Sequence, residues 1–236
     1  MSMKIYIVKT DYITDETLSN LCLAVDPEQR QRIHRFINKE DKVRTLIGDI
    51  LTRSIIAEQL KLKNEQINFG KSKFGKPYLK SFKDFHFNIS HSGEFIVCAI
   101  SSNPIGIDIE QVKCIDYKNI AEKFFTESEV KYILDSNYTD SLSRFYRIWT
   151  LKESYIKCHG MGLSIPLKSF SIEIVDETIK DIVDSEYAFL LRTIYIDKEY
   201  SMAVCSQNKN ISENVVTVNQ SLLIDNYLKL TGVCKV

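Results

Sequence analysis

The chain has 236 residues, which suits one large domain or two small ones. Its formal net charge is zero, so there is no general argument for a nucleic acid or a membrane surface as a partner. No apolar stretch approaches a membrane span, and the N-terminal residues turn polar too soon for a signal peptide. The six cysteines show neither a C-x-x-C pair nor a metal-ligand spacing. We therefore expect a reduced, cytoplasmic protein that binds neither nucleic acid nor membrane. A monomer is a separate expectation, which no sequence pattern carries.

The first half of the sequence predicts a strand, then helices, then more strands. Residues 3–8 are expected to form the first strand. Pro27 follows a plausible N-cap, Asp26, and predicts a helix over residues 27–37. Apolar residues at helical spacing predict a longer helix over residues 40–60. After a turn at FGKP, the segments HFNIS and FIVCAIS predict a β-hairpin, and IGIDIE predicts a further strand.

The second half repeats the order of helices followed by strands. Residues 118–134 are helical in pattern, and Thr126 with Glu129 forms a capping box that starts a new helix there. A long helix is predicted over residues 141–159, ended by GMG. Strands are predicted at residues 169–175, 187–196 and 201–206.

This repeated order predicts an α+β fold of two similar lobes related by a pseudo-twofold. We place the N-terminal lobe at residues 1–104 and the C-terminal lobe at residues 105–236, with the seam between them near residues 103–112. The tail after about residue 208 contains an apolar stretch, SLLIDNYLKL, to which the pattern assigns no role.

Two carboxylates lie close together in the segment IGIDIE. Isoleucines alternate with Gly106, Asp108 and Glu110, so a strand points both acids to the same face. Facing carboxylates repel each other unless a cation lies between them. Oxygen ligands favour a hard cation such as Mg²⁺, which commonly takes one or two carboxylates together with phosphates. The alternative is a strand edge whose acids are solvated or paired with basic neighbours.

The predicted helix over residues 141–159 offers a third acid. Glu153 lies at the edge of an apolar stripe, and Lys157 follows one turn later on the same side. A half-buried glutamate in that place suits a metal ligand or a general base. The alternative is an ordinary surface pair, worth only about 0.2–0.5 kcal/mol.

Basic residues gather in the first half, where residues 30–44 hold six basic side chains against two acidic ones. Ser90 and His91 end a predicted strand, and the basic stretch that ends at Arg44 and Thr45 could fold near them. Arginine, lysine and histidine together make a phosphate cradle. The alternatives are a solvated helix face and a structural histidine. The sequence has no P-loop and no G-x-G-x-x-G pattern.

Five segments, FGKP, FNISHSG, GIDIE, KFFTESE and WTLKESYIK, occur in a recognisable order. In this order and at these separations they resemble the 4′-phosphopantetheinyl transferases, in the surfactin-synthetase-activating (Sfp-type) class. The resemblance runs from the first predicted strand to about residue 206. The combination of GIDIE with W-x-x-K-E-S/A-x-x-K is specific, although each half alone is weak.

The resemblance implies an enzyme that transfers the 4′-phosphopantetheine arm of coenzyme A to a serine of apo acyl or peptidyl carrier proteins. Adenosine 3′,5′-bisphosphate is released, and the carriers serve nonribosomal peptide, polyketide or fatty acid synthesis. The implied Mg²⁺ ligands are Asp108, Glu110 and Glu153. Glu153 and Lys157 are the implied catalytic residues, at the seam between the lobes. Whether Glu153 is the base or only a metal ligand stays open.

The resemblance also implies residues that bind coenzyme A, with Arg44, Lys76 and His91 chiefly at its 3′-phosphate. Gln29 stands where the family's type protein has a lysine, and Arg32 replaces another. The family docks carrier proteins at the helices around residues 123–134, so Phe124, Phe125, Val130 and Tyr132 are docking candidates. The alternative for each of them is an ordinary core residue. The implied coenzyme-binding residues are Arg32, Arg44, Thr45, Gly75, Lys76, Pro77, Ser90 and His91.

Three alternative functions use the same residues. The first is another Mg²⁺-dependent enzyme, such as a phosphohydrolase acting on a nucleotide. The second is a non-enzymatic protein that binds coenzyme A or a carrier domain. The third is an enzyme of the same chemistry devoted to the fatty acid carrier protein alone.

Overall fold

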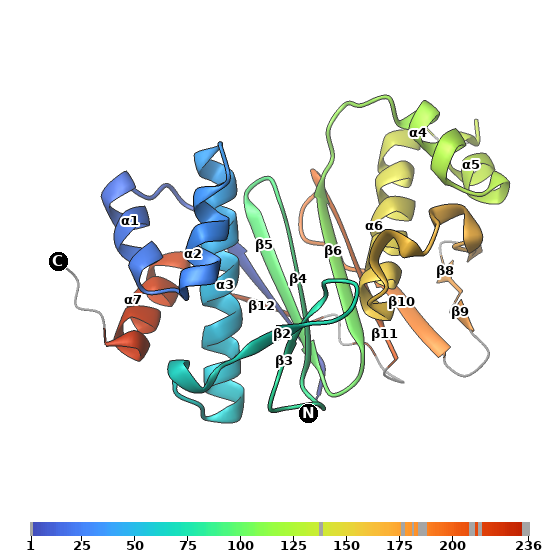
Figure 1. Ribbon diagram of the computed structural model, residues 1–236. Coiled ribbons are helices and arrows are strands. Elements are labelled where there is room, and N and C mark those ends of the chain that lie inside the picture. Colours follow the sequence, from blue (N-terminus) through green and yellow to red (C-terminus); the bar gives the residue numbers. More distant parts are fainter. Residues whose placement is uncertain are drawn as a thin grey trace.

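The computed structural model describes residues 2–136, 139–175, 178–180, 182–183, 188–207, 211 and 214–232. The fold is α+β: two four-stranded sheets lie side by side, and a long helix packs on each (Figure 1). No helix in the described ranges is both long and apolar enough to cross a membrane. The helices are α1 (Asp15–Leu23), α2 (Pro27–His34), α3 (Lys39–Leu60), α4 (Tyr117–Phe124), α5 (Glu127–Leu134), α6 (Ser141–His159) and α7 (Gln220–Thr231). The strands are β1 (Lys4–Lys9), β2 (Phe69–Lys71), β3 (Pro77–Leu79), β4 (His86–Ser92), β5 (Phe95–Ser101), β6 (Ile105–Gln111), β7 (Ile174–Val175), β8 (Thr178–Ile179), β9 (Ile182–Val183), β10 (Ala188–Thr193), β11 (Tyr200–Ser206) and β12 (Val215–Thr217).

The first lobe is a sheet in the order β12-β1-β5-β4, covered by α3. Strands β4 and β5 form the predicted hairpin, in which His86 pairs with Ser101 and Ser92 with Phe95. Apolar residues recur along α3 at helical spacing, so one face of the helix is buried in the core of this lobe. The sheet thereby holds β4 at its edge, next to the second lobe.

The second lobe follows the same plan, with α6 packed on a sheet in the order β6-β11-β10-β9. The side chain of Asp140 accepts a hydrogen bond from the Ser143 amide and so caps the start of α6. Gly160 ends the helix in the left-handed conformation, with φ of 78°. The predicted capping box of α5 is confirmed, since Glu129 Oε2 accepts a hydrogen bond from the Thr126 amide at 2.9 Å.

The two sheets meet where β4 lies beside β6, and side chains make the connection. Asn88 Oδ1 accepts a hydrogen bond from the Ile107 amide at 2.8 Å. Ser92 Oγ accepts one from the Gln111 amide at 3.0 Å, and Ser90 Oγ accepts a longer one from β6. Alternate residues of β4 therefore satisfy alternate amides of β6, and we call this set of hydrogen bonds the seam ladder.

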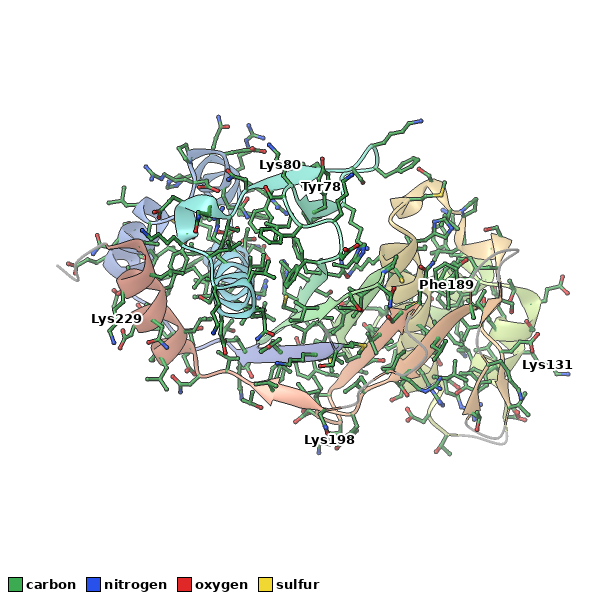
Figure 2. All side chains as sticks on the ribbon, turned by 90° about the horizontal axis from the view of Figure 1, so that it is seen from below. Tyr78, Lys80, Lys131, Phe189, Lys198 and Lys229 are labelled. Atoms are coloured by element: carbon green, nitrogen blue, oxygen red, sulfur yellow. The ribbon has the colours of Figure 1, made fainter. Side chains whose placement is uncertain are left out.

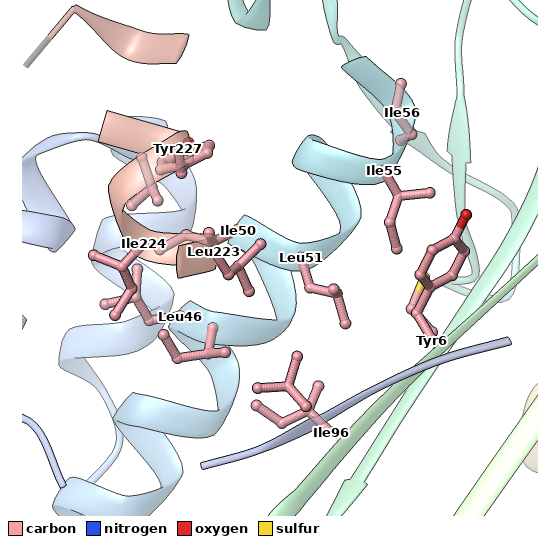
Figure 3. Packing of buried hydrophobic residues seen from close by; sticks show 14 of the residues in the cluster. Tyr6, Leu46, Ile50, Leu51, Ile55, Ile56, Ile96, Leu223, Ile224 and Tyr227 are labelled. Carbon is pink, nitrogen blue, oxygen red and sulfur yellow. The ribbon is translucent and has the colours of Figure 1, made fainter. Parts of the chain in front are cut away.

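The C-terminal tail, residues 214–232, lies in the first lobe. The predicted division had assigned everything after residue 104 to the second lobe. Strand β12 runs parallel to β1, and α7 packs on α3. Figure 3 shows Leu223, Ile224 and Tyr227 of α7 beside Leu46 of α3, within one buried cluster. The expected C-terminal lobe of residues 105–236 is thus corrected: residues 214–232 belong to the first lobe. In Figure 2, Lys229 of α7 and Lys131 of α5 lie at opposite ends of the molecule, so the tail is far from the helices of the second lobe.

The predicted strand over residues 169–175 is confirmed only at its end, where Ile174–Val175 pairs as a strand. Residues 169–173 are not part of a strand, and there the prediction is wrong. The amide of Ile172 donates instead to the buried carboxylate of Glu129, at 2.7 Å. The predicted helix from Pro27 ends at His34 rather than at residue 37. Helix α1 and the small β2–β3 hairpin had no sequence prediction.

We predict that α7 stabilises the first lobe. Tyr227 is fully buried, and its hydroxyl donates to the Ala24 carbonyl at 3.1 Å. Replacing it in Tyr227→Ala should lower the free energy of unfolding by about 3–5 kcal/mol, as for other buried aromatic residues. The control is Leu222→Ala on the exposed side of α7, with an expected change below about 0.5 kcal/mol. Equal denaturant midpoints for the two variants would contradict this role.

Candidate active site

Strand β6 and helix α6 are in direct backbone contact at Gly106. A Cβ at this position would lie 2.0 Å from the Ser154 carbonyl oxygen and 2.3 Å from the Cys158 nitrogen. Only glycine permits that approach. Because Asp108 and Glu110 follow Gly106 at alternate positions, both acids lie on the strand face that α6 covers. The intervening isoleucines are fully buried on the opposite face.

Asp108 is the most deeply buried acid of the predicted set, with 3% of its surface exposed. Its Oδ1 accepts hydrogen bonds from Lys157 Nζ at 2.5 Å and from Ser90 Oγ at 2.9 Å. Its Oδ2 is buried and has no hydrogen-bond partner. Glu110 Oε2 accepts a hydrogen bond from Ser92 Oγ at 2.9 Å. Each acid is thus oriented by a serine of the seam ladder.

The three predicted acids lie near enough to interact electrostatically. Burial raises the pKa of Glu110 above its ordinary value, and the charge of Asp108 raises it further, with a smaller effect from Glu153. Burial also raises the pKa of Glu153, as does Asp108, while Lys157 opposes the shift. The arrangement concentrates negative charge. Lys157 is close enough to both glutamates for its positive charge to oppose the rise in their pKa values.

The acids do not form a closed metal site of three ligands. Among the described residues, no group of three His, Cys, Asp or Glu side chains is arranged to hold a metal ion. The unpartnered Oδ2 of Asp108, beside Glu110, does suit a cation that takes two carboxylates and completes its shell with phosphate oxygens. The residues therefore fit a magnesium ion that binds together with a phosphorylated substrate.

Basic groups border the acids on the side of the first lobe. Arg44 on α3 donates to the Gly93 carbonyl at 2.9 Å and pairs with Asp41 at 2.6 Å. Desolvation lowers the pKa of His91, and the nearby charges of Arg44 and Lys157 lower it further. The buried hydroxyl of Thr45 has no hydrogen-bond partner. The structure thus places Arg44 near His91, and Lys157 of the second lobe lies close enough to influence the same imidazole.

The ammonium of Lys76 meets backbone carbonyls, whereas the family resemblance implies a contact with the 3′-phosphate of coenzyme A. Its Nζ donates to the carbonyl oxygens of Ile105 at 2.9 Å, Lys157 at 2.6 Å and Cys158 at 3.3 Å. An ammonium has three donors, and these three acceptors use all of them. The expected phosphate contact from this side chain is therefore not supported.

Comparisons with known proteins match nearly the whole chain. Residues 13–103 match the family model described as 4'-phosphopantetheinyl transferase, N-terminal, and residues 104–205 match the 4'-phosphopantetheinyl transferase superfamily. The chain is 38% identical over 225 residues to 4'-phosphopantetheinyl transferase Sfp of Bacillus subtilis (strain 168), covering 94% of this chain and 100% of that protein. It belongs to the 4′-phosphopantetheinyl transferase family, in the Sfp-type class.

Two further relatives of this transferase show how widely the likeness extends. The 4'-phosphopantetheinyl transferase gsp of Aneurinibacillus migulanus is 45% identical over 149 residues, covering 63% of this chain and 62% of that protein. The L-aminoadipate-semialdehyde dehydrogenase-phosphopantetheinyl transferase of Xenopus laevis is 31% identical over 204 residues, covering 77% of this chain and 68% of that protein.

Other predicted residues of the transferase lie at the surface or in the core. Arg32 is exposed on α2, while Gln29 Nε2 donates to Asp49 Oδ1 at 3.3 Å and so faces the protein. Gly75, with φ of 85°, and Pro77 shape the exposed turn of the β2–β3 hairpin.

The predicted carrier-docking set needs one correction. Phe125 is 1% exposed and stacks on Phe145 in the core of the second lobe. Phe124 is 40% exposed, and Val130 and Tyr132 are partly buried. Phe124 is therefore the exposed member of the set, on a helix adjacent to α5.

Three residues that position the site, Asn88, Ser92 and Lys152, had no sequence prediction. The ladder residues Asn88 and Ser92 alternate with Ser90 in FNISHSG, so the period of two was a usable signal. Lys152, within WTLKESYIK, forms a fully buried ion pair with Glu129 at 2.6 Å and ties α6 to α5. Nothing in a single sequence marks which lysine of that segment is internal.

We predict that Gly106→Ala disrupts the transferase at the contact between β6 and α6. The new Cβ meets rigid backbone atoms, so strand and helix must separate, with an expected loss of at least about 1–3 kcal/mol of stability. The matched control is Gly48→Ala on α3, where a Cβ meets only methyl groups at 3.6 and 3.7 Å. There the higher helix propensity of alanine should give up to about 1 kcal/mol of added stability. Thermal unfolding separates the two, and an unperturbed Gly106→Ala would refute the contact.

Proposed function

We propose that this enzyme transfers the 4′-phosphopantetheine arm of coenzyme A to a serine hydroxyl of apo-carrier proteins, with magnesium as cofactor. The supporting observation is the group formed by Asp108, Glu110, Glu153 and Lys157, where β6 and α6 touch at the seam between the lobes. Four charged groups of this kind suit phosphoryl transfer, in which positioning and charge neutralisation supply most of the catalysis. The expected cytoplasmic location and monomeric state remain predictions.

Asp108 and Glu110 are the proposed magnesium ligands. Asp108 Oδ2 is buried without a partner, and Glu110 is held beside it by Ser92. When bound, magnesium would neutralise negative charge on the pyrophosphate of coenzyme A. Glu153 lies close enough for its pKa to be raised by Asp108, and it is either a third ligand or a base.

In the reaction, the serine oxygen attacks the phosphorus that carries the pantetheine arm. The bond from that phosphorus to the bridging oxygen breaks, and adenosine 3′,5′-bisphosphate leaves with the electron pair. The raised pKa of Glu153, due to burial and to Asp108, makes its carboxylate a stronger base for the serine proton than a solvated glutamate. Lys157 Nζ donates to phosphate oxygens on which negative charge grows.

Arg44 and His91 are the proposed partners of the 3′-phosphate, and the unpartnered hydroxyl of Thr45 is a further donor. Arg44 is held in place by Asp41 and the Gly93 carbonyl, so its guanidinium is preorganised. The turn at Gly75 and Pro77 is the proposed wall of the nucleotide site, and Ser90 is a further residue proposed to shape it.

The function is tested by incubating the enzyme with coenzyme A, Mg²⁺ and an apo-carrier protein. The carrier should gain the mass of phosphopantetheine, and adenosine 3′,5′-bisphosphate should form in equal amount. A carrier whose acceptor serine is replaced by alanine is the control and should remain unmodified. A phosphohydrolase would release the bisphosphate without any carrier, and a binding protein would release none.

We predict that Glu153→Gln and Lys157→Ala fail in different ways. Glu153→Gln loses a negative charge and any base, so turnover should fall by about 100-fold or more, and added Mg²⁺ should restore it only partly. Lys157→Ala keeps every acid, so its loss of about 100-fold should persist at all Mg²⁺ concentrations. Single-turnover rates across a Mg²⁺ titration measure both.

The control for this pair is Glu65→Gln, an exposed glutamate outside the site, which should behave like the parent. If Glu153→Gln and Lys157→Ala also behave like the parent, then both side chains form an ordinary surface pair and the mechanism is wrong.

We also predict that Arg44 and His91 distinguish coenzyme A from 3′-dephospho-coenzyme A. Hydrogen bonds to charged groups contribute about 1.5–3 kcal/mol each, so loss of the 3′-phosphate should weaken binding at least about tenfold. Arg44→Gln should shrink that ratio, whereas Arg35→Gln, an exposed arginine after α2, should preserve it. Calorimetry with both ligands measures the ratio of the two affinities. Equal affinities in the parent enzyme would show that Arg44 and His91 do not bind the 3′-phosphate.

A further inference from the structure

Lys76 connects the first lobe to the helix that carries Glu153 and Lys157. It lies in the turn of the β2–β3 hairpin, which reaches across β4 towards the end of α6 (Figure 1). Its side chain is half-buried, and its Nζ meets the carbonyl oxygens of Ile105, Lys157 and Cys158 at 2.9, 2.6 and 3.3 Å. Two of these acceptors belong to the last turn of α6, and the third begins β6.

Those two helix carbonyls would otherwise lack intrahelical partners. The last four carbonyl groups of a helix have no amide to accept from within the helix, and their dipoles favour a cation. The Gly160 amide satisfies the Ile156 carbonyl at 2.9 Å. The Lys76 ammonium donates to the next two carbonyls, those of Lys157 and Cys158. The end of α6 is therefore capped in part by a side chain from the first lobe.

The contact of Lys76 with the end of α6 lies next to the candidate active site. The backbone carbonyl that Lys76 holds most closely is that of Lys157, whose side chain reaches Asp108 at 2.5 Å. The same ammonium holds the first residue of β6, three residues before that aspartate. Strand and helix are thus fixed to each other at the end of their contact.

We propose that Lys76 is a positioning residue, which fixes the last turn of α6 on β6 and so sets where the Lys157 ammonium stands. The inference rests on the proposed function for its kinetic consequences. It also joins the turn that contains Gly75 and Pro77, the proposed wall of the nucleotide site, to the reacting groups. Coenzyme A bound against that turn is therefore held in register with Lys157 through a single side chain.

The competing role is a direct contact with the 3′-phosphate, and kinetics distinguish the two. Lys76→Met keeps the length of the side chain but removes all three donors. For a positioning residue, kcat falls by about 100-fold, as expected for a small misplacement of a reacting group, with both coenzyme A and its 3′-dephospho form. The preference for coenzyme A over the dephospho form stays as in the parent. Loss of that preference with little change in kcat would overturn the proposal.

Two matched variants complete the comparison. Lys73→Met, in the same hairpin, removes an exposed lysine whose ammonium lies 5.6 Å from the Phe74 ring, and it should behave like the parent. Lys76→Arg keeps the charge and binds phosphate at least as well, but a planar guanidinium does not match three converging carbonyls. A phosphate contact predicts full activity for Lys76→Arg, and the positioning role predicts reduced kcat.

Amide hydrogen exchange gives a readout that does not depend on transfer. In Lys76→Met the amides of the last turn of α6 and of Gly160 should exchange faster than in the parent, while those near Asp140 should not change. Unchanged exchange at the last turn overturns the positioning role even if the enzyme proves to catalyse another reaction. Faster exchange in an enzyme that does not modify carriers would instead preserve this role and reject the proposed function.

Discussion

The backbone contact between β6 and α6 sets the distances within the candidate active site. At Gly106 the helix backbone occupies the space that a side chain would fill, with a Cβ only 2.0 Å from a helix carbonyl oxygen. Asp108 and Glu110 continue the same strand face, so the helix that rests on the glycine also lies over the acids. Glu153 and Lys157 consequently share a small volume with them. An ordinary side chain at Gly106 would hold strand and helix apart and separate these charges.

The seam ladder transmits the same geometry to the first lobe. An ordinary sheet would pair β4 and β6 through their carbonyls, but here side chains of β4 accept from the amides of β6. A hydroxyl can accept and donate together. Ser90 and Ser92 therefore hold the strand and also orient Asp108 and Glu110. The lobe that presents Arg44 and His91 is thereby aligned with the lobe that presents the acids.

Like charges held this closely oppose folding, and the structure offsets only part of that repulsion. Burial and mutual repulsion raise the pKa values of Glu110 and Glu153, which means that their charged forms are disfavoured in the folded protein. Lys157 compensates Asp108, yet one oxygen of that aspartate has no partner. Groups left unsatisfied in this way are common where a ligand completes the interactions.

The local features follow from the amino-acid sequence alone: helices from apolar spacing, the α5 capping box, the hairpin, and two acids on one face of IGIDIE. The sequence also carried the family, because ordered motifs are a property of the chain. The packing of the whole chain was needed to see which lobe holds the tail, that Phe125 is core, and that the Lys76 ammonium meets backbone carbonyls. Those outcomes depend on contacts between segments distant in sequence. A lysine in a turn has the same letter and the same neighbours whether its ammonium meets solvent, a phosphate or the end of a helix.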